Sequence, residues 1–231
     1  MSRRNKLQKF AEVLSFPNVY ENFDAKNPVL TGTGGVEVDL KGKWAQQHFS
    51  NDNPITLELA CGKGDYTPGL ARQFPERNFI GVDIKGARIW RGAKTALEEG
   101  LTNAAFLRTR IELIAHFFEK GEVSEIWITF PDPFLRKSKA NRRLTSDHFL
   151  EQYKRILANG GLVHLKTDEP NLYDFTLEVL AENKDYTLLY HDDDIYSKAL
   201  PMPELELKTF YEKQHLAAGK TIKYIRFRLD N

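Results

Sequence analysis

The stretch that decides the fold is Ile55–Ala71, which reads ITLELACGKGDYTPGLA. It starts with a short apolar run, breaks at a turn that contains Gly62 and Gly64, and continues into a helical pattern. A strand that turns through glycines into a helix is how many α/β folds present a backbone loop to a nucleotide. The stretch therefore predicts a ligand loop at the carboxyl end of a buried strand.

The same alternation continues toward the C-terminus, where short runs of branched and aromatic residues separate helical segments. The expected strands cover residues 55–60, 78–83, 104–109, 124–130, 161–167, 186–190 and 222–229. The expected helices cover residues 66–74, 87–100, 111–120, 145–157 and 169–184, with Thr145 or Ser146 as the cap of the fourth and Gly160-Gly161 as its end. Strands joined by single helices imply right-handed crossovers. We therefore expect a Rossmann-like α/β fold, with a mainly parallel seven-stranded sheet and helices on both faces.

The segment before Ile55 has a different pattern. A basic amphipathic arm at about residues 4–14 is followed by a loop rich in Asn, Pro and Gly that extends to Pro54. The predicted organisation is an N-terminal arm and loop, residues 1–54, and an α/β domain, residues 55–231.

Composition limits the setting in which the protein works. The 231 residues carry a net charge of +1, so any basic surface is local. One cysteine cannot form an internal disulfide, and neither a membrane-spanning stretch nor the apolar core of a signal peptide is present. We expect a cytoplasmic protein without membrane contact. The six histidines lack ligand spacing, so no metal site is predicted, and monomer or homodimer stays open.

The glycine loop does not fit a diphosphate ligand. A dinucleotide loop needs G-x-G-x-x-G, but the third position is Thr67. Glu58, four residues before Gly62, would repel a pyrophosphate, whereas Asp83 ends the next strand where an acid accepts ribose hydroxyls. An adenosine ligand with a cationic, phosphate-free tail satisfies these features, and S-adenosylmethionine is such a molecule. Cys61 has no basic neighbour to activate it and is interpreted as a packing residue.

The fourth expected strand delivers Asp132 between two prolines at its carboxyl end. Five cations without an opposing acid follow within eight residues, a composition that suits phosphate oxygens and favours RNA binding; they are Arg136, Lys137, Lys139, Arg142 and Arg143. The alternative is a solvated loop.

The fifth strand and a later helical pattern offer further polar residues. Lys166, Thr167 and Asp168 lie at the end of the strand, and Asp168 either caps the next helix or contacts substrate. Thr209, Tyr211 and Glu212 lie in the later pattern. The carboxylate of Asp168 or Glu212 could accept from the N1 and amino hydrogens of guanine. For Glu212, sequence alone favours a solvated helix face.

These residues carry a family resemblance. Over Leu57–Glu212 the chain closely resembles the bacterial tRNA (guanine-N7-)-methyltransferases in five motifs, which keep the family's order and spacing: ELACGKG, GVDIKGARIWRGAKTALEEG, FPDPF…RKSKANRRLT, HLKTD and TFYE. The resemblance implies a class I methyltransferase fold, S-adenosylmethionine as cofactor, and methylation of a tRNA guanine in the variable loop, position 46 in conventional tRNA numbering.

The resemblance also implies roles for single positions. Glu58, Asp83 and Asp132 match cofactor contacts, and Asp132 also matches the catalytic position. Gly62 and Gly64 belong to the cofactor loop. Arg110 stands on the adenine side, where the family usually has Asp or Asn, so the neighbouring Glu112 is an alternative contact. The substrate-binding positions are Arg136, Asp168, Thr209 and Glu212.

Two alternatives stay open. One is a methyltransferase of the same fold that acts on another RNA position or acceptor; the PDPF motif differs from the amine-methylating pattern of Asn or Asp, Pro, Pro, aromatic. The other is a noncatalytic RNA-binding module, which loss of Glu58, Asp83 or Asp132 would indicate, and all three are present.

Overall fold

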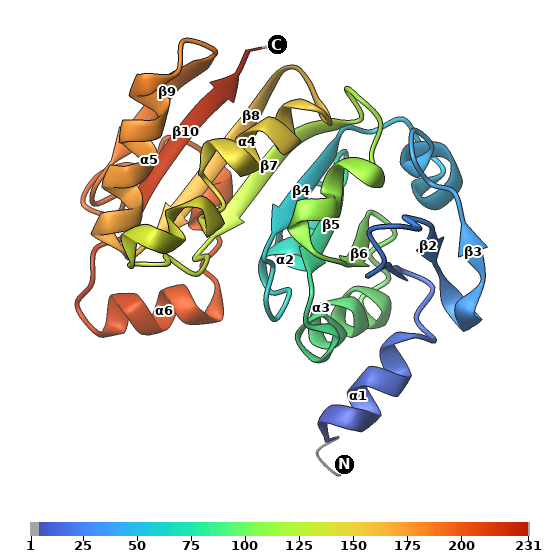
Figure 1. Cartoon of the computed structure of the whole chain (residues 1–231). Coiled ribbons are helices and arrows are strands. Elements are labelled where there is room, and N and C mark those ends of the chain that lie inside the picture. Colours follow the sequence, from blue (N-terminus) through green and yellow to red (C-terminus); the bar gives the residue numbers. More distant parts are fainter. Residues whose placement is uncertain (1–4, 231) are drawn as a thin grey trace. The chain divides into compact units, whose positions relative to one another are not determined.

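The computed structural model describes residues 5–230, and the chain divides after Glu119 into two compact units. Unit 1 extends to Glu119 and unit 2 starts at Lys120. Figure 1 shows that each unit is built from strands and covering helices.

Unit 1 contains a sheet in which β4, β5, β6 and β1 run parallel, and β2 and β3 extend it antiparallel in the order β3-β2-β1-β6-β5-β4. The strands are β1 (Val19–Glu21), β2 (Leu30–Thr31), β3 (Glu37–Val38), β4 (Ile55–Leu59), β5 (Asn78–Asp83) and β6 (Ala104–Arg108). Every residue of β4 and β5 is buried, as expected for parallel strands covered on both faces.

The helices of unit 1 are α1 (Lys6–Val13), α2 (Tyr66–Gln73) and α3 (Gly86–Glu98), with short 3-10 turns at Thr33–Gly35 and Ile111–His116 and a π-helical turn at Trp44–Phe49. The turn at Ile111–His116 replaces the longer helix expected at 111–120. Of the arm expected at residues 4–14, Arg4 lies outside the described residues, and the rest forms α1 with an Asn5 capping box.

The loop predicted between the arm and Pro54 is wrong, because this segment contributes β1, β2, β3 and the π-helical turn. Its apolar side chains explain the difference: Val19, Leu30 and Trp44 are buried, and Trp44 Nε1 donates to Phe117 O at 2.8 Å. The expected seven strands are all present as β4 to β10, so the structure has ten strands within residues 5–230.

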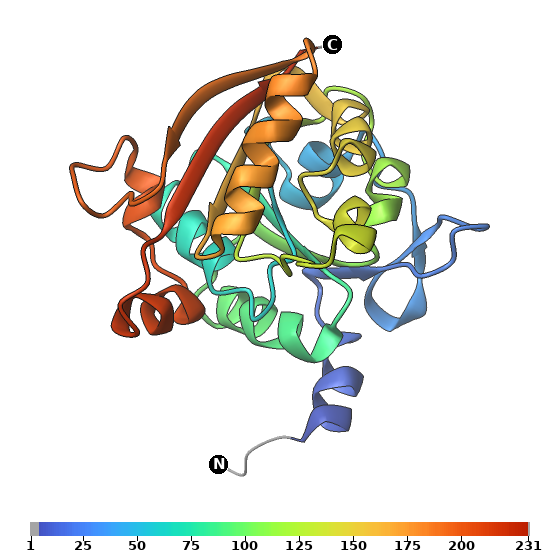
Figure 2. The same ribbon diagram turned by 60° about the vertical axis from the view of Figure 1, so that its left-hand side comes forward.

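Unit 2 contains a second group of strands in the order β7-β8-β10-β9, in which β7 and β8 are parallel and β10 is antiparallel to both of its neighbours. The elements are β7 (Val123–Thr129), β8 (Leu157–Thr167), β9 (Tyr186–Asp192), β10 (Lys223–Leu229), α4 (Asp147–Lys154), α5 (Pro170–Glu182), α6 (Phe210–Ala217) and 3-10 turns at Lys137–Arg142 and Pro203–Glu206. Figure 2 shows α5 lying along β9 and β10.

Two boundary predictions in unit 2 are corrected. The helix expected at 145–157 ends at Lys154, and Gly160-Gly161 lie inside β8 rather than at the helix end. Asp168 does not cap α5; the cap is Glu169, whose side chain accepts from Asn171 N, with Pro170 in the first turn as expected.

Among the helices of residues 5–230, none has the length and apolar character that crossing a membrane requires.

Candidate functional site

The predicted ligand loop of unit 1 joins β4 to α2 and is bent by three residues with positive φ. These are Ala60 at 56°, Gly62 at 56° and Gly64 at 65°. The two glycines differ in surroundings. A Cβ on Gly64 would lie 2.9 Å from the Phe106 ring and 3.0 Å from Gly92 Cα, whereas a Cβ on Gly62 would meet nothing closer than 3.8 Å. Gly64 therefore serves packing, and Gly62 leaves open space for a ligand beside the backbone.

Glu58 lies buried at the base of this loop. Its Oε2 accepts from Thr67 N at 2.9 Å and from Thr67 Oγ1 at 2.5 Å, so the carboxylate holds the first turn of α2. A Cβ on Gly81 would lie 2.8 Å from Thr67 Oγ1, so the glycine at that position in β5 leaves room for the hydroxyl. Thr67 occupies the position at which a dinucleotide motif would have its third glycine. Here its backbone and side chain both bind Glu58, the acid that was expected to repel a pyrophosphate.

Asp83, at the end of β5, joins the loop to the next strand connection. Its Oδ2 accepts from Gly62 N at 2.9 Å and its Oδ1 accepts from Lys85 N at 2.8 Å. Each carboxylate oxygen has a second lone pair, so the same group can also accept from ribose hydroxyls. The structure brings Glu58, Gly62, Gly64 and Asp83 together at the carboxyl edge of β4 and β5.

The other unit 1 residues differ in accessibility. Cys61 is buried, and burial, reinforced by the charges of Glu58 and Asp83, raises the pKa of its thiol well above the usual range. A neutral thiol agrees with the packing interpretation. Arg110 and Glu112 are both exposed at the turn that follows β6.

In unit 2, Asp132 follows β7 in a tightly bent loop. Phe130 and Phe134 adopt φ of 50° and 42°, and Pro131 is buried while Asp132 is exposed. Phe130 N donates to Lys166 O at 2.8 Å, which places the start of this loop beside the end of β8. The Asp132 and Asp168 loops therefore leave the same edge of β7 and β8.

Arg143 supports this loop. The prediction that it is an exposed phosphate ligand is wrong. It is buried, its Nε donates to Pro133 O at 3.0 Å, and its Nη2 donates to Phe134 O at 3.2 Å. The guanidinium lies 4.4 Å from the centroid of the Phe175 ring. The four other cations of the run, Arg136, Lys137, Lys139 and Arg142, are exposed.

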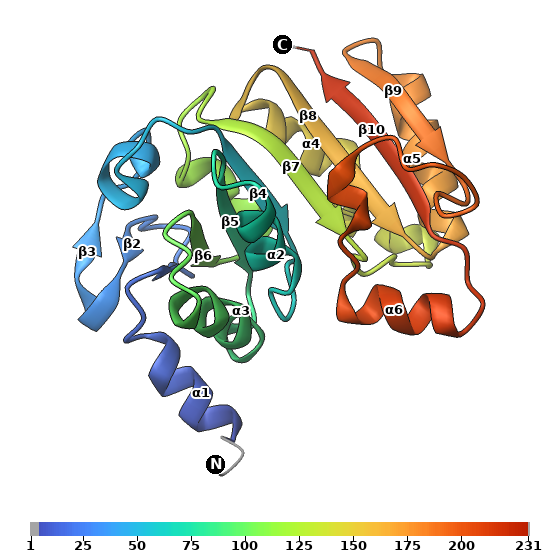
Figure 3. The ribbon, with the colours of Figure 1, turned by 180° about the vertical axis from the view of Figure 1, so that it is seen from behind.

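The helix α6 is attached to the ends of β7 and β8, as Figure 3 shows from behind. Asp168 Oδ2 pairs with Lys220 and lies 3.3 Å from His215 Nδ1. The His215 ring also stacks on Phe130 at 5.6 Å. Asp168 thus binds α6 and its following loop, and is only half-buried.

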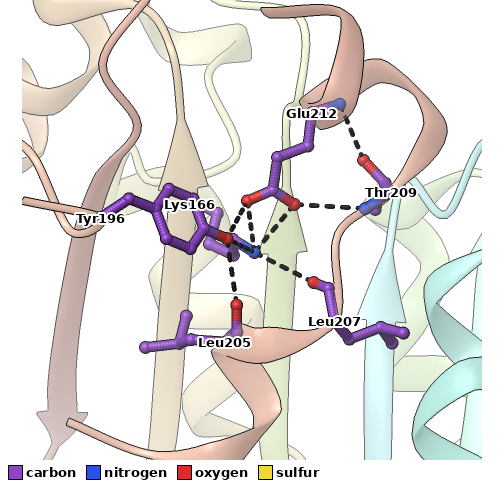
Figure 4. Close-up of polar contacts among 6 residues, drawn as sticks. All are labelled: Lys166, Tyr196, Leu205, Leu207, Thr209 and Glu212. Atoms are coloured by element: carbon purple, nitrogen blue, oxygen red, sulfur yellow. Dashed lines mark hydrogen bonds and ion pairs between the residues drawn. The ribbon is translucent and has the colours of Figure 1, made fainter. Parts of the chain in front are cut away.

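Glu212 is completely buried, so the solvated helix face favoured from sequence is wrong. Its two oxygens lie 2.7 and 2.9 Å from Lys166 Nζ, and Tyr196 OH donates to Oε1 at 2.5 Å (Figure 4). Thr209 completes a capping box with Glu212, with bonds of 3.1 and 3.2 Å. Burial lowers the pKa of Lys166 despite the opposing attraction of Glu212. We call Lys166, Tyr196, Thr209 and Glu212 the α6 clamp.

Sequence reasoning missed Tyr196 and the pairing of Lys166. A lysine in the apolar strand run GLVHLKT was the available signal, because a lysine at a strand position with buried neighbours requires a counter-charge. The sequence contains no indication of which acid supplies the counter-charge for Lys166.

Comparisons with known proteins agree with this architecture. A family model described as "Putative methyltransferase" matches residues 52–225. The chain is 50% identical over 230 residues to a tRNA (guanine-N(7)-)-methyltransferase of Christiangramia forsetii, covering 99% of this chain and 100% of that protein. It is 48% identical to a Bacteroides fragilis protein of the same name, over 98% and 86% of the two chains. The solved structure of the 16S rRNA methyltransferase KamB shares the fold, with a TM-score of 0.62 at 15% identity over 86% of this chain and 98% of that one.

Proposed function

Since the chain belongs to the tRNA (guanine-N(7)-)-methyltransferase family, we propose that it transfers a methyl group from S-adenosylmethionine to N7 of a guanine in tRNA, with the guanine of the variable loop as the target. The cytoplasm, where tRNA is processed, is the proposed location. The alternative of a noncatalytic module has no support in any feature described above.

The arrangement of Asp83 is the observation that carries the cofactor part of the proposal. Asp83 is a buried carboxylate at the end of β5, next to the glycine loop that follows β4. Two backbone amides fix it, and its remaining lone pairs can accept from ribose hydroxyls. Gly62 leaves space beside it, and Glu58 adds negative charge at the base of the loop. This combination of hydrogen-bond acceptors and negative charge suits a nucleoside with a cationic tail and no phosphate. Arg110 and Glu112 remain the candidates for the adenine side.

When bound, S-adenosylmethionine supplies an electrophilic methyl group. Guanine N7 has an in-plane lone pair that attacks without losing a proton, so the protein needs no general base and can act largely by alignment. Positive charge develops on the guanine ring as N7 is methylated. The exposed Asp132 carboxylate is proposed to stabilise that charge, and Arg136 is proposed to hold the backbone of the splayed nucleotide.

Asp168, Thr209 and Glu212 are proposed to act on substrate mainly by holding α6 at the edge of β8. Asp168 is the one of the three with partial exposure at that edge, and it remains the candidate for a direct contact to guanine. Glu212 is enclosed by its partners and serves as an anchor in this proposal.

The test is methyl transfer from labelled S-adenosylmethionine to total tRNA, followed by identification of the nucleoside. We expect 7-methylguanosine. Asp132→Asn should lower kcat about 100-fold or more, as removal of one transition-state stabiliser does, while leaving unfolding unchanged. Asp193→Asn, at another exposed carboxylate, is the matched control. A different modified nucleoside, or full turnover by Asp132→Asn, would refute the assignment.

A further inference from the structure

Helices α1 and α3 pack side by side in unit 1 (Figures 1 and 3). Together they contain more Lys and Arg than Asp and Glu. Their contact is fixed at Trp90, whose Nε1 donates to Glu12 Oε2 at 2.8 Å and whose ring lies 4.7 Å from Lys9 Nζ. The basic arm expected at the N-terminus is therefore held on α3 through the described residues of α1. We define the α1–α3 face as Lys6, Lys9, Lys85, Arg88 and Arg91.

The acids of these two helices are already occupied. Lys94 Nζ lies 3.9 Å from Glu12 Oε1 and 3.6 Å from Glu98 Oε1, and Glu99 pairs with Arg72 of α2. Lys85, Arg88 and Arg91 make no ion pair with any residue of the described range 5–230, and all three are exposed. The face thus keeps its charge, although the whole chain has a net charge of only +1.

The geometry of the face suits a linear polyanion. Arg88 and Arg91 are three residues apart and lie on one side of α3, and Lys85 is the residue that directly precedes the helix. The three positions extend over roughly 9 Å at the helical rise. Ile89 and Ala93 of the same helix are buried, whereas Arg88 and Arg91 are exposed. A nucleic-acid duplex presents several phosphates over that length.

The face also begins at the proposed cofactor edge. Lys85 N donates to Asp83 Oδ1 at 2.8 Å, and α3 starts at the next residue. A polyanion bound along α3 would therefore lead toward the edge at which the methyl donor is proposed to bind. Among basic surfaces, this continuity favours a nucleic acid over an anionic lipid membrane.

We propose that the α1–α3 face binds the sugar-phosphate backbone of the tRNA substrate. The proposal rests on the proposed function for the identity of the RNA, but it assigns a contact surface separate from the residues that hold cofactor and guanine. Phosphate contacts of this kind set affinity and orientation without reading sequence.

The experiment compares tRNA binding by Arg88→Gln/Arg91→Gln with the wild-type protein at several salt concentrations. We expect about tenfold weaker binding and a slope of log K against log salt that is smaller by about 1 to 2, because two phosphate contacts are lost. Lys26→Gln/Lys41→Gln removes the same charge from exposed positions elsewhere in unit 1 and is the matched control. Arg88→Lys/Arg91→Lys should retain most of the affinity and the slope.

Calorimetry with S-adenosylmethionine should give the same Kd for the single variant Arg91→Gln and the wild-type protein, which separates a lost RNA surface from a damaged fold. Arg88 is left out of this comparison because its charge acts on Cys61 in the proposed cofactor loop. Equal tRNA affinity and salt slope in Arg88→Gln/Arg91→Gln and the control pair would overturn the proposal. So would unchanged tRNA binding combined with lost binding to phosphatidylserine vesicles, which would assign the face to a membrane. Binding without any methyl transfer by the wild-type protein would instead contradict the proposed function alone.

Discussion

The α6 clamp allows a quantitative prediction, because Lys166 and Glu212 form an ion pair in which both side chains are fully buried. Lys166→Met removes the ammonium but keeps an unbranched stem. The Glu212 carboxylate then keeps Tyr196 OH and Thr209 N as donors but loses its counter-charge. Leaving one partner of a buried pair unpaired costs about 3–5 kcal/mol, out of a total stability of about 5–15 kcal/mol. For a chain of this length, Tm should fall by roughly 6–20 °C.

Glu212→Gln tests the other partner. Lys166 then faces Tyr196 OH and Leu207 O, each at 3.4 Å, without a carboxylate. Its pKa, already lowered by burial, should fall further. A lysine with a depressed pKa binds fewer protons in the folded chain than in the unfolded chain between its folded pKa and its usual value. The stability of this variant should therefore rise with pH through that window, more steeply than that of the wild-type protein.

The decisive assay is a double-mutant cycle measured by urea unfolding of Lys166→Met, Glu212→Leu and the double variant. Replacing both charges by apolar groups removes the unpaired charge, so the double variant should be more stable than the sum of the single losses by about 2 kcal/mol or more. The exposed pair Lys43–Asp39, at 2.6 Å, is the control, and its loss should be undetectable. Additive losses at Lys166 and Glu212 would refute the reasoning.

His48, the two glycines of the loop after β4, and Arg143 each allow a further prediction. Burial lowers the pKa of His48 to about 4, so between about pH 4 and 6.5 the unfolded chain binds a proton that the folded chain does not. The free energy of unfolding is therefore highest above this window and falls by up to about 3 kcal/mol as pH drops through it. Urea unfolding of His48→Gln at several pH values should lack this dependence. Both Gly62 and Gly64 have positive φ, but Gly64→Ala should lower Tm more than Gly62→Ala because its Cβ would also contact Phe106 and Gly92. Calorimetry of Gly62→Ala should in addition show weaker S-adenosylmethionine binding. Arg143→Ala should lower kcat for methyl transfer without changing the salt dependence of tRNA binding, since its guanidinium holds the carbonyls of the Asp132 loop.

The part of the fold that could be predicted is the part with strong local patterns. Strands β4 and β5 have branched and aromatic residues interrupted only by single polar or glycine positions and are buried throughout, so they were predicted to within a residue. Strands β1, β2 and β3 have only two or three residues each and lie among Asn, Gly and Pro, so no period is visible. Their order depends on pairing such as Val19 with Phe106, which no local pattern encodes.

The site shows the same limit. Asp83 and Glu58 could be placed at strand ends because a strand end is a local feature. Glu212 could not, since its burial depends on Lys166, 46 residues earlier in the chain, and on Tyr196 in a loop. Arg143 shared a cationic run with Arg136, but the two flank the 3-10 turn Lys137–Arg142, and only Arg143 folds back onto the carbonyls of Pro133 and Phe134. The ligand roles of these residues stay predictions.

Four of the acids that were assigned proposed roles, two in each unit, differ in how their carboxylates are bonded. Glu58 has one oxygen fixed by two donors from Thr67, Asp83 has one backbone amide on each oxygen, and Glu212 is enclosed by the α6 clamp. A carboxylate with such fixed partners can hold a loop in place before the ligand arrives, and Asp83 keeps a second lone pair on each oxygen for ribose hydroxyls. Asp132 is the exposed member of the four and lies in the loop bent at Phe130 and Phe134. Its carboxylate is therefore proposed, together with the half-buried Asp168, to approach the guanine ring, and a shorter or longer side chain at Asp132 should alter kcat more than any measure of stability.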